Sequence, residues 1–71
     1  MNSEQIKVLL YQYLIFKGDF YKNQAVTSLN KLKQKPFKDV SLSEIDKAHI
    51  DLEIHLAFES FASDLINLLD L

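Results

Sequence analysis

The sequence predicts an all-α fold, in which an antiparallel helical hairpin and one long C-terminal helix pack as a three-helix bundle. Apolar residues recur at helical spacing in three segments, residues 3–17, 20–34 and 42–69. Gly18 and Pro36 are the only residues of their kind in the chain, and they separate the three segments. We therefore expect residues 1–71 to form a single helical domain.

The composition excludes several classes of function. The chain has no Cys, which rules out disulfides and thiolate metal sites. Its net charge is −2, and all eight basic residues are Lys, so neither the overall field nor Arg side chains favour sequence-specific DNA binding. A domain of 71 residues buries roughly 60% of the surface of its unfolded chain, which makes a stabilising partner subunit plausible.

The first predicted helix, residues 3–17, begins at Ser3 as N-cap and ends at Gly18 as a left-handed C-cap. It is apolar on two sides. The broad side consists of Ile6, Leu9, Leu10, Tyr13, Leu14 and Phe16, and the opposite stripe consists of Val8, Tyr11 and Ile15. Three interpretations remain open: a central helix buried within its own chain, a second stripe that contacts another chain, or a strand over residues 14–16.

The second predicted helix, residues 20–34, follows so closely that it must run antiparallel to the first. Asp19 is its expected N-cap, and Pro36 ends it because the ring disfavours helical geometry at Lys35. Its apolar residues form one stripe, as in an ordinary amphipathic surface helix.

The third predicted helix, residues 42–69, has the clearest start, because Ser41 and Glu44 have capping-box spacing. About 28 residues span about 42 Å, against about 22 Å for each hairpin helix, so half of it would extend beyond the hairpin. We assign its longer stripe to the core: Ile50, Ile54, Phe58, Phe61, Leu65 and Leu68. The two stripes could also be exchanged, or a kink near residues 51–53 could give a four-helix monomer.

The apolar residues left over predict an interaction surface. They are Val8, Tyr11, Ile15, Leu42, Ile45, Leu52 and Leu56, with His49 among them. Leaving them in water would make a larger apolar patch than monomers usually expose, so we expect a symmetric homodimer. The predicted function is a helical protein–protein interaction module, a regulator, inhibitor or adaptor. Its partner protein could also contact acidic groups, namely Asp46, Glu53, Asp64 and Asp70.

An alternative function is a nucleic-acid-binding regulator. A basic cluster with one aromatic residue precedes the third helix: Lys31, Lys33, Lys35, Phe37 and Lys38. The simpler interpretation is that these Lys side chains complement a helix dipole and that Phe37 packs back onto the hairpin. We therefore expect no nucleic-acid binding.

The sequence predicts no catalytic, cofactor or metal site. His49 and His55 lie on different faces of one helix. Asp46, His49 and Glu53 share a face, but a metal site of this kind needs carboxylates from several helices. We expect no enzyme and no cofactor. The apolar run of residues 8–16 is too short to span a bilayer and lacks signal-peptide features, so we expect a cytoplasmic protein without membrane contact.

Overall fold

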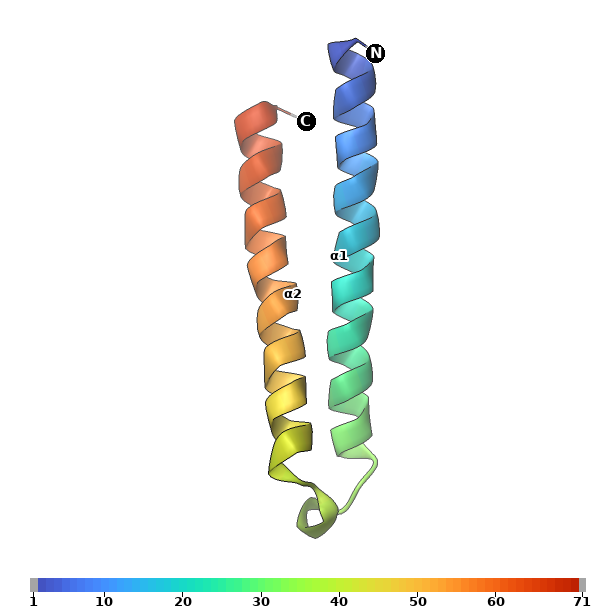
Figure 1. The fold of residues 1–71 in the computed structure, drawn as a ribbon, viewed down its shortest axis with the longest axis vertical. Coiled ribbons are helices and arrows are strands. Elements are labelled where there is room, and N and C mark those ends of the chain that lie inside the picture. The colour runs from blue at the N-terminus through green and yellow to red at the C-terminus, as the bar shows by residue number, and fades with distance from the viewer. Residues whose placement is uncertain (1, 71) are drawn as a thin grey trace.

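The computed structural model describes residues 2–70, which form a two-helix hairpin (Figure 1). Helix α1 spans Ser3–Lys33, a short 3₁₀ turn η1 spans Phe37–Asp39, and helix α2 spans Leu42–Leu69. The two helices run antiparallel, and the molecule is a rod measuring 56 × 16 × 14 Å. The prediction of an all-α fold is confirmed.

The predicted three-helix bundle is wrong, because residues 3–17 and 20–34 belong to one continuous helix. Gly18 is not a left-handed C-cap, since no Gly among the described residues has a positive φ, and Asp19 is not an N-cap. A Gly inside a helix costs only about 1 kcal/mol relative to Ala. Packing of α1 against α2 along its whole length overrides that small local cost.

Because α1 is one continuous helix, the expected mismatch in length between the C-terminal helix and a short hairpin does not occur. Helix α1 has 31 residues and α2 has 28, so both are about 42–47 Å long. Helix α2 coincides with the expected third helix and is uninterrupted, so the kink considered near residues 51–53 does not occur. Two helices of equal length replace a long helix and a short hairpin.

Side-chain caps fix the helix ends. Asn2, and not the expected Ser3, is the N-cap of α1, and it forms a capping box with Gln5. Helix α1 ends before Pro36, with Gln34 as C-cap. Ser41 caps α2 by accepting a hydrogen bond from the backbone N–H of Glu44, as the sequence predicts.

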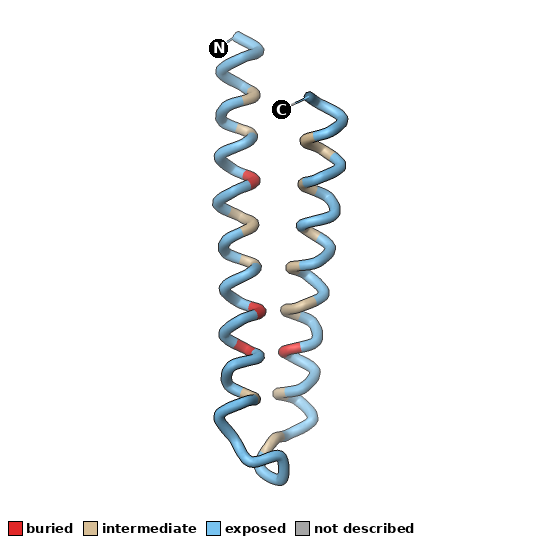
Figure 2. The backbone as a smooth tube through the Cα atoms, turned by 180° about the vertical axis from the view of Figure 1, so that it is seen from behind, coloured by how far each residue is buried: buried red, intermediate tan, exposed pale blue. Residues whose placement is uncertain are grey.

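The contact between the helices follows one line along each of them, which we call the seam. On α2 the seam residues repeat at alternating spacings of four and three: Glu44, Ala48, Asp51, His55, Phe58, Ala62 and Leu65. On α1 they are Leu14, Gly18, Tyr21, Ala25, Ser28 and Leu32. All of them are buried or half-buried, and the buried ones lie on the inner sides of the helices (Figure 2). This spacing is that of antiparallel helices crossing at a shallow angle.

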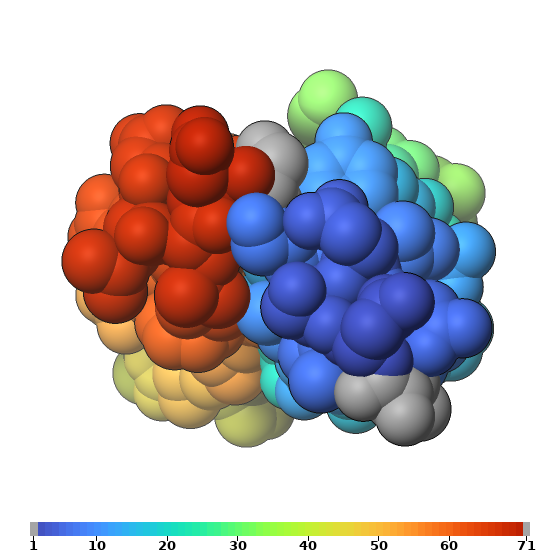
Figure 3. Space-filling view, turned by 90° about the horizontal axis from the view of Figure 1, so that it is seen from above, coloured from blue at the N-terminus to red at the C-terminus, as the bar shows by residue number. Residues whose placement is uncertain are grey.

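The seam is narrow and fully buries few apolar side chains. The buried apolar residues among those described are Leu14, Ala25 and Ala48. The helices lie closer together near the loop, where the seam residues are small, than at the open end (Figure 1). Seen from the open end, they are two rods in contact (Figure 3).

The predicted core stripe of α2 is therefore wrong as well. Phe58 and Leu65 face α1, but Ile50, Ile54, Phe61 and Leu68 are between 42% and 79% exposed. The seam runs between the two apolar stripes recognised in the sequence, so α1 covers Phe58 and Leu65 but leaves most of both stripes exposed.

We predict that Gly18→Ala stabilises the protein by about 0.5–1 kcal/mol, because Gly18 is helical and Ala is the better helix former. A Cβ atom at this position would lie 3.7 Å from Cε1 of Phe58, an ordinary van der Waals contact. Urea unfolding followed by circular dichroism measures the change. Gly18→Asn serves as the control, because Asn tolerates a left-handed cap; a chain stabilised by Asn and destabilised by Ala would have a helix break here.

Candidate protein-interaction site

The seam divides the remaining surface of the hairpin into two faces. On each helix, residues that directly follow a seam position point to one face, and residues that directly precede one point to the other. Because the helices are antiparallel, the rule gives the same face on both. Two concavities agree with it: one joins Val8, Gln12 and Ile15 to Asp70, and another joins Lys31 to Lys47.

We call the first surface the Tyr11 face. It comprises Val8, Tyr11, Ile15, Val26 and Leu29 of α1, and Leu42, Ile45, His49, Leu52, Leu56 and Ile66 of α2. All eight residues expected at an interface lie on it, and seven of them are exposed, with Leu52 half-buried. Sequence reasoning missed Val26, Leu29 and Ile66, which become part of this face only because α1 is continuous and the seam is known.

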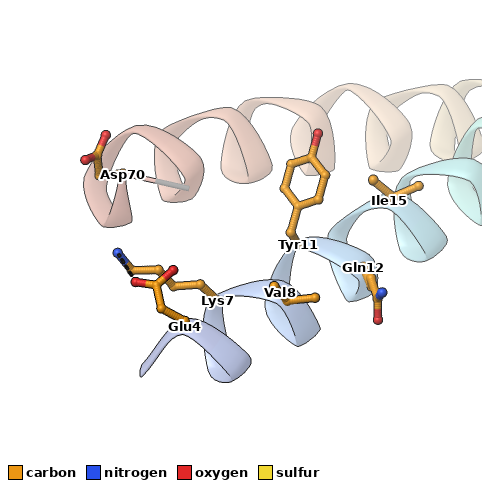
Figure 4. A pocket seen from close by; sticks show the side chains of 7 residues that line it. All are labelled: Glu4, Lys7, Val8, Tyr11, Gln12, Ile15 and Asp70. Carbon is orange, nitrogen blue, oxygen red and sulfur yellow. Dashed lines mark ion pairs between the residues drawn. The ribbon is translucent and has the colours of Figure 1, made fainter. Parts of the chain in front are cut away.

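A shallow groove of about 670 Å³ opens on the Tyr11 face near the open end of the hairpin. Tyr11 stands in its middle and points toward α2, with Val8 and Ile15 on either side (Figure 4). Glu4, Lys7 and Asp70 form its charged rim, and the Lys7 and Glu4 side chains are 4.0 Å apart. The groove can receive apolar side chains of another molecule between charged edges.

We call the opposite surface the Phe61 face. It comprises Ile6, Leu10, Tyr13 and Phe20 of α1, and Ile50, Ile54, Phe61 and Leu68 of α2. Aromatic rings connect it to the seam: Phe20 contacts Tyr21, Tyr21 contacts Phe58, and Phe58 contacts Phe61, at centroid distances of 5.2–6.0 Å. Sequence reasoning assigned most of its α2 side to the core.

The outer side of α2, directly opposite the seam, is polar throughout. It carries Asp46, Glu53, Ser60 and Asn67, all of them exposed. The acidic residues named as possible contacts of a partner are thus not on one surface: Asp46 and Glu53 lie here, and Asp64 and Asp70 lie near the open end. A helix with one polar line and three apolar or closely packed sides has the pattern of a helix that is covered on three sides.

Polar side chains bridge the seam near the loop. Ser28, which is 8% exposed, donates a hydrogen bond to Asp51 of the other helix. Lys47 donates to the same carboxylate at 2.8 Å. The hydrogen bonds from Lys47 and then Ser28 hold the pKa of Asp51 below its ordinary value of 3.8. This cluster favours one register of α1 against α2, because a shift by one turn would break the hydrogen bond between Ser28 and Asp51 and leave the carboxylate paired with Lys47 alone.

His55 occupies the next seam position. Its side chain is 15% exposed, its Nε2 atom lies 3.3 Å from Oε1 of Glu59, and its buried Nδ1 atom has no hydrogen-bond partner among the described residues. His49 lies on the Tyr11 face and pairs with Glu53 at 3.0 Å. The two His residues are therefore apart, and no group of three or more possible metal ligands occurs within residues 2–70.

The loop end of the hairpin is basic. Lys31, Lys35 and Lys47 line a small cavity together with Glu44, and Lys35 binds Glu44 at 2.9 Å. The hydrogen bond from Lys35 is the main cause of the lowered pKa of Glu44. Phe37 does not pack back onto the hairpin as expected: it is 89% exposed at the tip of the loop.

Comparisons with known proteins identify no relative. No protein-family model matches the chain, and neither the curated proteins nor the solved structures that were searched give a match. In the part of the chain that the structure describes, neither helix has both the length and the hydropathy needed to cross a bilayer.

We predict that Ser28→Ala destabilises the protein by about 1–2 kcal/mol, because the half-buried Asp51 carboxylate loses a hydrogen bond across the seam. The free energy of unfolding should also decrease as the pH is lowered. Asp51 has a lower pKa in the folded chain than in the unfolded chain, so the unfolded state binds more protons below about pH 4, and stability is lost as the pH falls through the lowered value.

Chemical unfolding of wild type and of Asp51→Asn between pH 7 and pH 2 measures this contribution. The variant should be less stable than wild type at neutral pH and should lose less stability on acidification. Equal acid sensitivity of the two proteins would mean that the Ser28–Asp51–Lys47 cluster contributes nothing to folding.

Proposed function

We propose that this chain is a helical protein–protein interaction module that works as a homodimer, with two hairpins joined through their Tyr11 faces. The observation that supports the proposal is the balance between buried and exposed apolar groups. Three apolar residues are buried, whereas 19 large hydrophobic side chains are at least 36% exposed. A hairpin with so small a core gains little stability from its own packing.

Covering one face supplies the missing burial. The long and middle dimensions of the hairpin, 56 and 16 Å, give a face of about 900 Å². Stable protein–protein interfaces bury about 800 Å² on each partner. Eight of the 19 exposed side chains belong to the Tyr11 face, and fully burying such a side chain contributes roughly 1.5–3 kcal/mol. If each of these side chains contributes half of that free energy, the sum over the two copies is enough to offset the entropic cost of bringing two molecules together.

The shape and the charges of the Tyr11 face favour this face for self-association. It has a concavity in which apolar side chains of a second copy can insert. It also carries Glu4, Lys7 and Asp70 at one end and Lys33 at the other, so the two ends have opposite net charge and two copies of the same face can be complementary. The product is a four-helix bundle, the arrangement that antiparallel helical hairpins commonly form.

The Phe61 face stays open in such a dimer. Its exposed rings, Tyr13, Phe20 and Phe61, are residue types that interfaces favour. We propose that this face binds an apolar surface of a partner protein. The polar outer side of α2 then remains the surface that faces water.

We predict that Leu56→Glu, on the Tyr11 face, weakens self-association at least about tenfold, because it places a charge in an apolar contact. Ile54→Glu is the matched control, since Ile54 lies on the same helix, is also exposed, and points to the Phe61 face. It should change the dimer dissociation constant less than about threefold. Sedimentation velocity between about 1 and 50 μM measures both.

Two results would contradict the proposal. The wild-type chain could sediment as a fully helical monomer over this concentration range, which would remove self-association altogether. Alternatively, Ile54→Glu could dissociate the dimer while Leu56→Glu left it intact, which would move the dimer contact to the Phe61 face.

A second candidate function, nucleic-acid binding, is favoured by one observation. Phe37 is exposed at the loop tip, where its ring is free to stack on a base, and Lys31, Lys33 and Lys38 lie nearby. Two features oppose it: Lys35 is already paired with Glu44, and the chain carries a net charge of −2.

This alternative predicts binding to single-stranded oligonucleotides at low salt that falls steeply as salt is added. Changing Lys31, Lys33 and Lys38 together to Glu should abolish it, while Lys17→Glu, far from the loop, should not. Fluorescence anisotropy with a labelled 20-mer at about 20 mM salt measures binding. No change in anisotropy at protein concentrations up to about 100 μM would exclude this function.

A further inference from the structure

From the distribution of charge along the hairpin we infer that the second copy on the Tyr11 face is inverted, so that the loop of each hairpin lies at the open end of the other. This inference rests on the proposed homodimer and specifies its geometry. Two symmetric ways of stacking the Tyr11 faces exist, because the two-fold axis can run along the hairpin or across it.

An axis along the hairpin places the two loops together. Helix α1 then lies over α2 of the second copy, and the two open ends are neighbours. An axis across the hairpin places the loops at opposite ends, and α1 lies antiparallel over α1 of the second copy. Apolar side chains occur on the Tyr11 face at both ends, from Val8 to Ile15 and from Ile45 to Leu56. Apolar matching is therefore available to both arrangements, and charge has to separate them.

The two ends of the hairpin carry opposite charge. The loop end has five Lys residues and three acidic residues: Lys31, Lys33, Lys35, Lys38 and Lys47 against Asp39, Glu44 and Asp46. The open end has three acidic residues and one Lys: Glu4, Asp64 and Asp70 against Lys7. Within the described chain the loop end is thus net positive and the open end net negative, and the two lie at opposite ends of a rod 56 Å long.

This polarity favours the inverted arrangement. With the loops together, two positive ends and two negative ends become neighbours, and with the loops apart each positive end lies beside a negative one. Salt screens the repulsion between like charges of two neighbouring ends. It does not remove that repulsion where the groups lie within one Debye length, about 8–10 Å.

Charges on the Tyr11 face itself agree with the same arrangement. When α1 of one copy overlaps α1 of the inverted copy from end to end, Glu4 of one copy falls within a turn of Lys33 of the second copy. Val8 falls level with Leu29 of the second copy in the same way. With the loops together, Val8 would instead lie over Asp70 of the second copy.

The experiment measures the distance between identical labels in the dimer. The natural chain has no Cys, so a single Cys carries a nitroxide label at one defined position. Phe37→Cys places the label at the loop tip, where the side chain is 89% exposed and outside both faces. Asn23→Cys places it near the middle of α1, on the exposed side away from α2. Pulsed electron–electron double resonance reports distances between the two labels of a dimer.

The inverted dimer predicts about 50 Å between the loop-tip labels, near the full length of two overlapping rods, and less than about 30 Å between the mid-helix labels. A loop-tip distance below about 25 Å, alone or mixed with a longer one, would overturn the inverted geometry while self-association stood. Absence of dipolar coupling at both positions would show a monomer, and the proposed homodimer itself would fail.

Discussion

Two antiparallel helices of equal length can cover each other along one line only, and the rest of this structure follows from that constraint. The seam takes every third or fourth residue of each helix, and the residues before and after each seam position remain open. In this chain those flanking positions are mostly apolar. The hairpin consequently exposes far more hydrophobic side chains than it buries, which is the basis of the proposed contact with a second molecule.

The seam specifies geometry more than it supplies stability. Ser28, Asp51 and Lys47 join the helices at one register, and Ala25 and Ala48 let the backbones approach closely near the loop. Larger residues, such as Leu14 and Leu65, hold the helices further apart toward the open end (Figure 1). The groove around Tyr11 opens where this spacing is wider, so the choice of seam residues also shapes the proposed interaction site.

In the proposed module, folding and association would be coupled. The apolar groups that would stabilise the hairpin are also those that we propose contact a second molecule, so the fraction of folded chain would rise with the concentration of its partner. The two faces suit different contacts. The Tyr11 face has the concavity and the opposite charges at its ends that suit a second copy, whereas the Phe61 face offers aromatic rings, with Lys31 and Lys47 near the loop. In the proposed assembly, the polar outer side of α2 stays in contact with water.

The sequence by itself determined the helical class, the cap at Ser41 and the uninterrupted helix that follows it, because these depend on spacing and on local hydrogen bonds. It also grouped the eight residues that share the Tyr11 face: Val8, Tyr11, Ile15, Leu42, Ile45, His49, Leu52 and Leu56. Only the tertiary structure decided whether Gly18 ends a helix or continues it, since the local cost of about 1 kcal/mol is smaller than the packing of α1 along α2.

The seam could not be predicted from the sequence either. Ala48, Asp51 and His55 have the spacing of a contact line, yet they are small or polar, and the two apolar stripes beside them give the stronger hydrophobic signal. Hydrophobic periodicity identifies what should leave water, but not which neighbour covers it. Here α1 packs on the line between the two stripes of α2 and leaves most residues of both stripes exposed.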